Sequence, residues 1–445
     1  MRYRTRTYRK VTVLAAVAAL AGGLLAGCAE DKEDPGASSG GGGGDGGGGK
    51  TTLTVGVFGA FGLQEAGLYK EYEKLHPDIS IKQNSVQRNE NYWPALLTHL
   101  SSGSGLSDIQ AVEVGNIAEL TTSHADKLVD LGKADGVDKN DFLDWKWRQG
   151  TSKGGKTIGL GTDIGPTGIC YRKDLFEKAG LPTDREAVGK LWAGDWQKYL
   201  AAGKRYQKKA PDGTSFVDGA TGVMAAVHAS GKEKFYDKGG ELIYKDSPTV
   251  KEGWDLAAQF AESGLSAKLQ QFQPSWDQAI SNGSFATLTC PPWMLGYIKD
   301  KAGDKGEDKW DVAASPKPGN WGGSFLTVPE AGKNKEEATK LAAWLTEPEQ
   351  LAKLFDERAS FPSADAAYAL PEVKDAKNPY FGNAPVGKIF SKAAEGVPVQ
   401  PIGPKDGIIS QYLADTGMLG VDQKGTAPDE AWNKAVKTID NALDQ

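Results

Sequence analysis

The chain has 445 residues and a formal net charge of −6, with 52 Lys and Arg against 58 Asp and Glu. Its composition is that of a soluble globular protein, and residues 51–445 suffice for two domains or one large two-lobed unit. The mildly negative charge, with no basic stripe, argues against a nucleic-acid partner.

Residues 1–27 predict an export signal. Basic residues between Arg2 and Lys10 precede an apolar run over 11–25, which is too short for a comfortable membrane-spanning helix. The run ends at Leu25-Ala26-Gly27-Cys28, which resembles the bacterial lipobox, whose cysteine is lipidated and becomes the mature N-terminus. An uncleaved anchor with an incidental cysteine is the alternative. In both cases we expect the folded part to work on the outer face of the cell membrane.

Residues 28–50 predict a flexible tether. Residues 36–49 are almost entirely glycine, which buries no apolar surface and loses much backbone entropy on ordering. We assign no chemistry to this segment.

From residue 51 the chain alternates between strands and helices. The expected elements are strands at 52–58, 79–81 and 107–112 and helices at 68–75 and 93–100. This alternation predicts a mostly parallel α/β sheet. Ligands of such sheets bind beyond the carboxyl ends of the strands, so we expect the loops 58–62, 87–92 and 113–116 to share one edge.

A second α/β region begins near Asp163. The expected strands cover 168–171, 285–290 and 321–328, and the expected helices cover 196–208, 250–262, 276–280, 335–346 and 431–443. Strands alternating with helices therefore continue to the end of the chain.

Cys170 and Cys290 are the cysteines that follow Cys28. In an oxidising extracytoplasmic compartment, two cysteines pair more often than they stay reduced. Both lie in short apolar, strand-like runs, so a disulfide between neighbouring strands is one interpretation. Two buried small hydrophobic side chains are the other.

Several segments resemble one protein family. Residues 171–182, of sequence YRKDLFEKAGLP, are similar to a signature of the extracellular solute-binding proteins of carbohydrate ABC importers. Residues 107–109, 283–293 and 344–350 continue the resemblance in the correct order. The family is that of maltose-binding protein, with lipoprotein members in Gram-positive bacteria. Residues 186–192 with Trp196, and residues 378–385, resemble its actinobacterial cellobiose-binding branch.

The resemblance implies an α/β, two-lobed periplasmic-binding-protein fold of type II, hinged, with the ligand cleft between the lobes. We expect residues 51–162 with 310–358 in the first lobe and residues 163–309 with 359–445 in the second. Asp163-Ile164-Gly165-Pro166 would form the first hinge crossing, where glycine and proline absorb or restrict the backbone change on closure. The family also implies a monomer without cofactor that delivers its ligand to a permease pair with a cytoplasmic ATPase.

A sugar offers an apolar C–H face, so its site needs flat aromatic surfaces. Trp293 follows two prolines at a strand end, and its equivalent in the family stacks on a sugar ring. Trp321 precedes Gly322-Gly323, which leave room for a ligand; an ordinary turn tryptophan is the alternative. Trp276 and Phe61 are further candidates.

A sugar also offers hydroxyl groups, to which planar polar side chains donate or from which they accept hydrogen bonds in pairs. Glu113 lies just past the strand 107–112, where the family usually places an acidic ligand-binding residue. A solvated surface carboxylate is the alternative. The other polar candidates are Gln87, Arg88, Asn89, Asn91, Asp163 and Arg358.

The sequence gives little support for an enzyme. A retaining glycosidase needs two carboxyl groups about 5–5.5 Å apart, and nothing in the spacing of Glu113 and Asp163 demands such a pair. The four histidines lack metal-site spacing. We therefore expect neither catalysis nor a bound metal.

The sequence thus predicts a lipid-anchored binding protein that captures a di- or oligosaccharide. Sugar would touch both lobes only in the closed state and so shift the population toward closure. Cellobiose or short β-1,4-gluco-oligosaccharides are the favoured ligands. Xylo-oligosaccharides, lactose-like disaccharides and mannobiose are alternatives, and a peptide binder or a purely structural surface lipoprotein is more remote.

Overall fold

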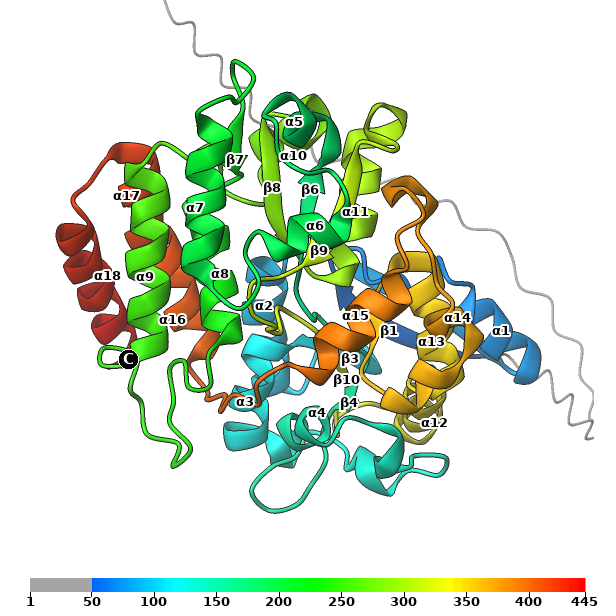
Figure 1. The fold of residues 1–445 in the computed structure, drawn as a ribbon. Helices are drawn as coiled ribbons and strands as arrows, with labels where there is room; N and C mark the ends of the chain where they lie inside the picture. The colour runs from blue at the N-terminus through cyan, green and yellow to red at the C-terminus, as the bar shows by residue number, and fades with distance from the viewer. Residues whose placement is uncertain (1–49, 445) are drawn as a thin grey trace, which may run out of the picture. The chain divides into compact units, whose positions relative to one another are not determined.

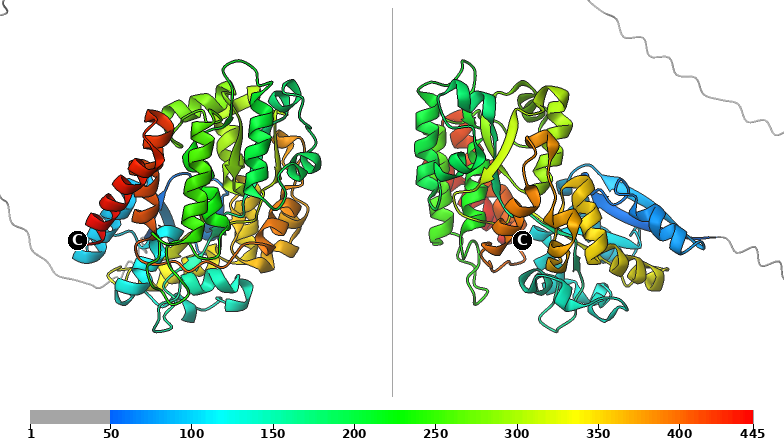
Figure 2. Two further views of the ribbon diagram at one scale, coloured as in Figure 1. Left: turned by 60° about the vertical axis from the view of Figure 1, so that its left-hand side comes forward. Right: turned by 45° about the vertical axis from the view of Figure 1, so that its right-hand side comes forward.

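The structure is a computed structural model that describes residues 50–444. The predicted signal, the lipidation residue Cys28 and most of the tether lie outside the described residues. Figure 1 shows two sheets with helices packed around them, one in the upper half of the view and one in the lower half, and Figure 2 separates them from two further sides. Across residues 50–444, no helix combines the length and the apolar character needed to cross a bilayer.

The first sheet has five strands in the order β2-β1-β3-β10-β4. Its strands are β1 (Thr51–Phe58), β2 (Ile79–Val86), β3 (Ile109–Glu113), β10 (Ser324–Thr327) and β4 (Leu160–Gly161). β1 runs parallel to β2 and β3, whereas β10 is antiparallel to β3 and β4. Alternate side chains of β1, such as Leu53, Val55 and Val57, are fully buried, as the period of a strand requires.

Helices of the first half of the chain surround this sheet. They are α1 (Leu68–Leu75), α2 (Asn89–Ser102), α3 (Val114–Ser123) and α4 (Asp144–Gln149), with the 3₁₀ turns η1 (Ala125–Lys127), η2 (Leu131–Lys133) and η3 (Lys139–Asp141). α12 (Lys335–Leu345) joins them and buries Leu341 and Leu345 in the same core as β1. We call this part of the molecule the first lobe.

The second sheet has four strands in the order β7-β8-β6-β9. β6 (Gly168–Arg172) is antiparallel to β8 (Phe285–Cys290) and to β9 (Trp310–Ala314), and β7 (Ser215–Val217) is parallel to β8. The expectation of a mostly parallel sheet is therefore confirmed for β1, β2 and β3, whereas the second sheet is mostly antiparallel. β9 also departs from the expected division, because residues 310–314 pair with β6 in the second sheet. We call the part built on this sheet the second lobe.

The remaining helices follow in chain order. They are α5 (Lys173–Lys178), α6 (Arg185–Lys190), α7 (Trp196–Gln207), α8 (Ala220–Ser230), α9 (Pro248–Glu262), α10 (Pro274–Asn282), α11 (Pro292–Ala302), η4 (Gly303–Gly306), α13 (Pro348–Arg358), η5 (Asp365–Ala369), α14 (Pro371–Lys374), η6 (Pro379–Phe381), α15 (Val386–Glu395), α16 (Asp406–Tyr412), the π-helix η7 (Leu413–Met418), α17 (Leu419–Lys424) and α18 (Pro428–Leu443).

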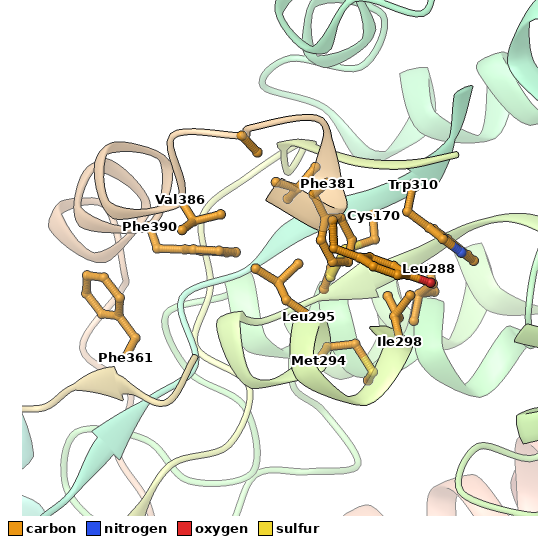
Figure 3. Close-up of a cluster of buried hydrophobic side chains, with 14 of the residues drawn as sticks. Cys170, Leu288, Met294, Leu295, Ile298, Trp310, Phe361, Phe381, Val386 and Phe390 are labelled. Carbon is orange, nitrogen blue, oxygen red and sulfur yellow. A yellow bond between two sulfur atoms is a disulfide. The ribbon is translucent and has the colours of Figure 1, made fainter. Parts of the chain in front are cut away.

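Figure 3 shows a core of the second lobe that joins distant parts of the chain. Cys170 on β6 and Cys290 on β8 form a disulfide, with Cα atoms 5.3 Å apart. Leu295 of α11 and the aromatic rings of Phe381 and Phe390 belong to the same core. The chain beyond α13 therefore returns to the second lobe.

Three segments run between the two sheets and pair with one another. β5 (Asp163–Ile164) pairs antiparallel with β11 (Phe361–Pro362), and Pro166 forms a β-bridge with Asn320. The Trp321 amide donates a hydrogen bond of 2.8 Å to the carbonyl of Gly165. A Cβ at Gly165 would lie 1.9 Å from the Trp321 carbonyl oxygen, so this close approach requires glycine. The pairing places Asp163 and Trp321 at the junction of the lobes.

Candidate functional site

The three loops expected to share an edge do lie together. The Gly59 amide donates to the Val86 carbonyl (3.0 Å), and Asn89 Nδ2 donates to Asn116 Oδ1 (2.9 Å). The prediction is confirmed because β1, β2 and β3 are parallel, so their carboxyl ends meet. α2 and α3 begin at this edge and present their N-termini to it.

Glu113 occupies the N-cap of α3. Its Oε2 accepts a hydrogen bond of 2.6 Å from the Gly115 amide, which satisfies one free N–H of the helix. Burial raises the pKa of this carboxyl group to about 7, although the Gly115 amide and the positive charges of Lys146 and Lys234 oppose the rise. A carboxylate held this way lacks part of its solvation, and hydroxyl donors of a ligand would restore it.

Lys146, on α4, is a buried cation beneath the same edge. Its side chain is 0% exposed, its Nζ lies 3.8 Å from the ring centre of Phe325, and among residues 50–444 this nitrogen has no hydrogen-bond partner. Burial lowers its pKa to about 8, against the opposing charges of Asp163 and Glu113. No pattern in the sequence pointed to this residue.

Asp163 stands at the first crossing between the lobes. Its Oδ1 accepts hydrogen bonds from the Ser324 amide (2.9 Å) and from Thr162 Oγ1 (2.8 Å). Burial raises its pKa above the usual value, and Lys146 opposes that rise. Two carboxyl groups and one lysine therefore share a poorly hydrated region between the sheets.

The second lobe meets this region through α16. A Cβ at Gly407 would lie 3.2 Å from Asn116 Nδ2 and 3.4 Å from the Gly115 carbonyl oxygen, so the two lobes touch here. Lys234 pairs with the buried Asp406 at 2.9 Å, and its charge also acts on Glu113. Charged groups of both lobes thus converge on the N-terminus of α3.

Trp293 and Trp321 form an aromatic pair at the junction. Their ring centres lie 5.5 Å apart at an interplanar angle of 67°, and Trp293 Nε1 donates to the Trp321 carbonyl oxygen at 3.3 Å. Both side chains are partly exposed. Gly322 takes a positive φ of 91°, and a Cβ there would lie 3.3 Å from Trp293 Nε1. Glycine at position 322 therefore leaves the Trp293 ring uncrowded, and the room for a ligand expected beside Trp321 stays a prediction.

The other aromatic candidates differ in position. Trp276 is 0% exposed in the core, where its Nε1 donates to Asp218 Oδ2 at 2.9 Å, so we remove it from the site. Its place follows from the apolar face of α10, which it shares with Ala279 and Ile280. Phe61 is partly exposed beyond β1.

The remaining polar candidates lie around the edge where the loops after β1, β2 and β3 meet. Gln87, Arg88 and Asn91 are exposed, and Arg88 pairs with Glu90. Arg358 lies 3.9 Å from Asp300 of α11, and its Cγ lies 2.4 Å from where a Cβ at Gly62 would stand. Arg358 therefore links the loop after β1 to the second lobe.

Two surface cavities lie elsewhere. One of about 310 Å³ is lined by residues such as Ser215, Gln278 and Asn282, and one of about 350 Å³ by residues such as Leu106 and Lys127. Neither includes a residue predicted for the site. Within residues 50–444, no group of three or more His, Cys, Asp or Glu side chains could hold a metal ion.

The fold is that of a two-lobed α/β protein, and comparisons with known proteins identify its family. Residues 67–380 match the bacterial extracellular solute-binding proteins. The arabinooligosaccharide-binding protein of Bacillus subtilis strain 168 is 26% identical over 348 residues, which cover 72% of each chain. The lactose-binding protein of Rhizobium radiobacter is 25% identical over 377 residues, covering 81% of this chain and 85% of its own.

A solved structure described as an extracellular solute-binding protein of family 1 is 43% identical. It superimposes with a TM-score of 0.78 and covers 88% of this chain and 99% of its own. The chain belongs to the family of bacterial extracellular solute-binding proteins. Its folded body therefore works outside the cytoplasm.

Proposed function

We propose that this chain is the sugar-binding subunit of an ABC importer. It would be held on the extracytoplasmic face of the cell membrane through lipidated Cys28. It captures an oligosaccharide and delivers it to a permease pair driven by a cytoplasmic ATPase, and it catalyses no reaction. The observation that carries the proposal is the partly exposed pair Trp293 and Trp321. Trp321 lies three residues before Ser324, which pairs with Glu113, and burial raises the pKa of the Glu113 carboxyl group. Relatives named for arabino-oligosaccharide and lactose support a carbohydrate ligand.

The mechanism follows from the division of these groups between two lobes. The first lobe supplies Glu113 and the second supplies Trp293, while Asp163 and Trp321 lie on the crossings. A sugar placed between them contacts both lobes only when they approach, so its differential affinity stabilises the closed state. In this proposal the first lobe consists of the residues predicted for it, 51–162 with 310–358, except for β9. β9 belongs to the second sheet because it pairs with β6.

Cello-oligosaccharides are the favoured ligands, on the resemblance of residues 186–192 and 378–385 to the cellobiose-binding branch. Xylo-oligosaccharides, lactose-like disaccharides and mannobiose are the alternative ligands. They would bind between the same two lobes through a different set of hydroxyl hydrogen bonds.

The test is calorimetric titration of the mature chain, residues 28–445 carrying Cys28→Ser, with cellobiose, cellotriose, xylobiose, maltose and lactose. Trp293→Ala should weaken the best ligand at least tenfold, since an aromatic ring that covers about 100 Å² of apolar surface contributes about 2 kcal/mol. Trp432→Phe is the control, because Trp432 is also partly exposed but lies on α18, away from α11 in Figures 1 and 2. Equal affinity of Trp293→Ala and the parent chain would refute the proposed site.

A further inference from the structure

Phe272 combines two features that a core phenylalanine would not show. Its side chain is 41% exposed, and its backbone has a φ of +62°. The left-handed region is disfavoured for a bulky aromatic residue, and glycine would take it without strain. Non-glycine residues in such conformations are concentrated at ligand clamps and other functional sites, where the surrounding structure holds them.

The surrounding structure does hold Phe272. Gln271 Nε2 donates to the buried Asp218 Oδ2 (2.8 Å), and Gln270 Nε2 donates to Asp415 Oδ1 (3.2 Å). Nearer the start of the segment, the Lys268 amide donates to Ser266 Oγ (2.9 Å). The chain is therefore fastened just before Phe272, and the exposed ring is held in a defined place.

The ring of Phe272 extends the aromatic pair at the junction. Its centre lies 6.2 Å from that of Trp293 at an interplanar angle of 33°, and the centre of Trp293 lies 5.5 Å from that of Trp321. Behind it, Trp276 and Tyr297 pack at 5.1 and 5.6 Å. Three rings therefore follow one another from the crossing outward, and the outermost has the largest exposed fraction.

Polar groups of both lobes lie near the segment that carries this outer ring. Gln270 and Asp415 lie beside it on the second lobe, with Asp415 in the π-helix η7, a form often found at functional sites. On the first lobe, Arg88 and Glu90 are exposed and close enough for their charges to act on Asp415. An apolar ring with polar side chains nearby has the chemistry that a sugar requires.

We propose that Phe272 is a third aromatic platform and that the ligand is therefore a linear oligosaccharide of at least three sugar units. This inference rests on the proposed function. One unit lies at Trp321, the next lies at Trp293, and a third covers the exposed face of Phe272. Phe272 thus selects for chain length, and a disaccharide leaves it uncovered.

The experiment measures the affinity of the mature chain carrying Cys28→Ser for a disaccharide, trisaccharide and tetrasaccharide of one series, cellobiose to cellotetraose. Phe272→Ala and Phe272→Gly remove the ring, and the glycine variant also removes the backbone strain, so its fold is kept. Phe272→Tyr restores the platform. Leu242→Ala is the matched control, because Leu242 is also 41% exposed but lies in another loop.

We expect Phe272→Gly and Phe272→Ala to weaken tri- and tetrasaccharide binding about tenfold while the disaccharide affinity changes less than twofold. Phe272→Tyr and Leu242→Ala should bind like the parent chain. An equal loss of affinity for all chain lengths, or no loss for any, would contradict the proposed role of Phe272. Either result would leave the proposed sugar site at Trp293 and Trp321 unaffected. Failure of the parent chain to bind this series and also xylobiose, maltose and lactose overturns the proposed function itself.

Discussion

Replacing Glu113 by Gln tests whether the site carries an under-solvated carboxyl group. The pKa of Glu113 rises from 4.5 to about 7 in the folded protein, and burial is the main cause. The folded state therefore binds this proton more tightly than the unfolded state does. The free energy of unfolding then falls as pH rises from about 4.5 to 7, and the full loss is present above pH 7.

A rise of that size corresponds to a loss of about 1–3 kcal/mol, at about 1.4 kcal/mol for each pKa unit and with allowance for water reaching a partly exposed group. Gln keeps an oxygen to accept the hydrogen bond from Gly115 but has no charge to desolvate. Glu113→Gln should therefore be more stable than the parent chain by about 1–3 kcal/mol at pH 8 and nearly equal to it at pH 4.5.

Urea unfolding at half-unit pH steps from 4.5 to 8.5 measures this difference. Glu336→Gln is the control, because the Glu336 side chain is 86% exposed on α12. Parallel stability profiles of Glu113→Gln and the parent chain would refute the reasoning. The same group should release a proton when sugar hydroxyls donate to it, since those bonds favour the charged form. Calorimetry at pH 7 in two buffers of different ionisation enthalpy should show the release in the parent chain and not in Glu113→Gln.

Two further substitutions test the frame that positions the site. Removing the disulfide with Cys170→Ala and Cys290→Ala should lower the free energy of unfolding by about 4–5 kcal/mol, because it closes a loop between residues 120 apart; urea unfolding that matches the parent chain would contradict this. Gly165→Ala should weaken sugar binding at least tenfold in calorimetry, since its Cβ would stand 1.9 Å from the Trp321 carbonyl oxygen and must displace the crossing. Gly154→Ala, whose Cβ would meet nothing nearer than 3.9 Å, should bind normally, and equal affinities of the two variants would exclude a role for the crossing.

Elements with strong local signals were predictable from the sequence. The helix expected at 68–75 is α1, Leu68–Leu75, since apolar spacing marks its buried face and Pro77 follows its end. The strand expected at 285–290 is β8, Phe285–Cys290, which Gly283 and Pro291 bound. The bounds of both elements are set by residues that are close in the sequence, so they can be predicted without knowledge of the tertiary structure.

Features set by distant contacts were not predictable. β9 resembles any short apolar strand, and only its pairing with β6 places it in the second lobe. Lys146 lies in the short, charged helix α4 and becomes buried because Phe325 and Asp163 meet it from far along the chain. Phe272 owes its backbone conformation to partners of Gln270 and Gln271 that are 145 and 53 residues away.

The measurement that tests the central claim most directly is a tryptophan fluorescence titration of the mature chain carrying Cys28→Ser, with cello-oligosaccharides and with tripeptides in parallel. The account predicts a saturable change with at least one oligosaccharide, lost in Trp293→Ala and kept in Trp432→Phe, and no change with peptides. Saturation by peptides, with no oligosaccharide producing a signal, would contradict it.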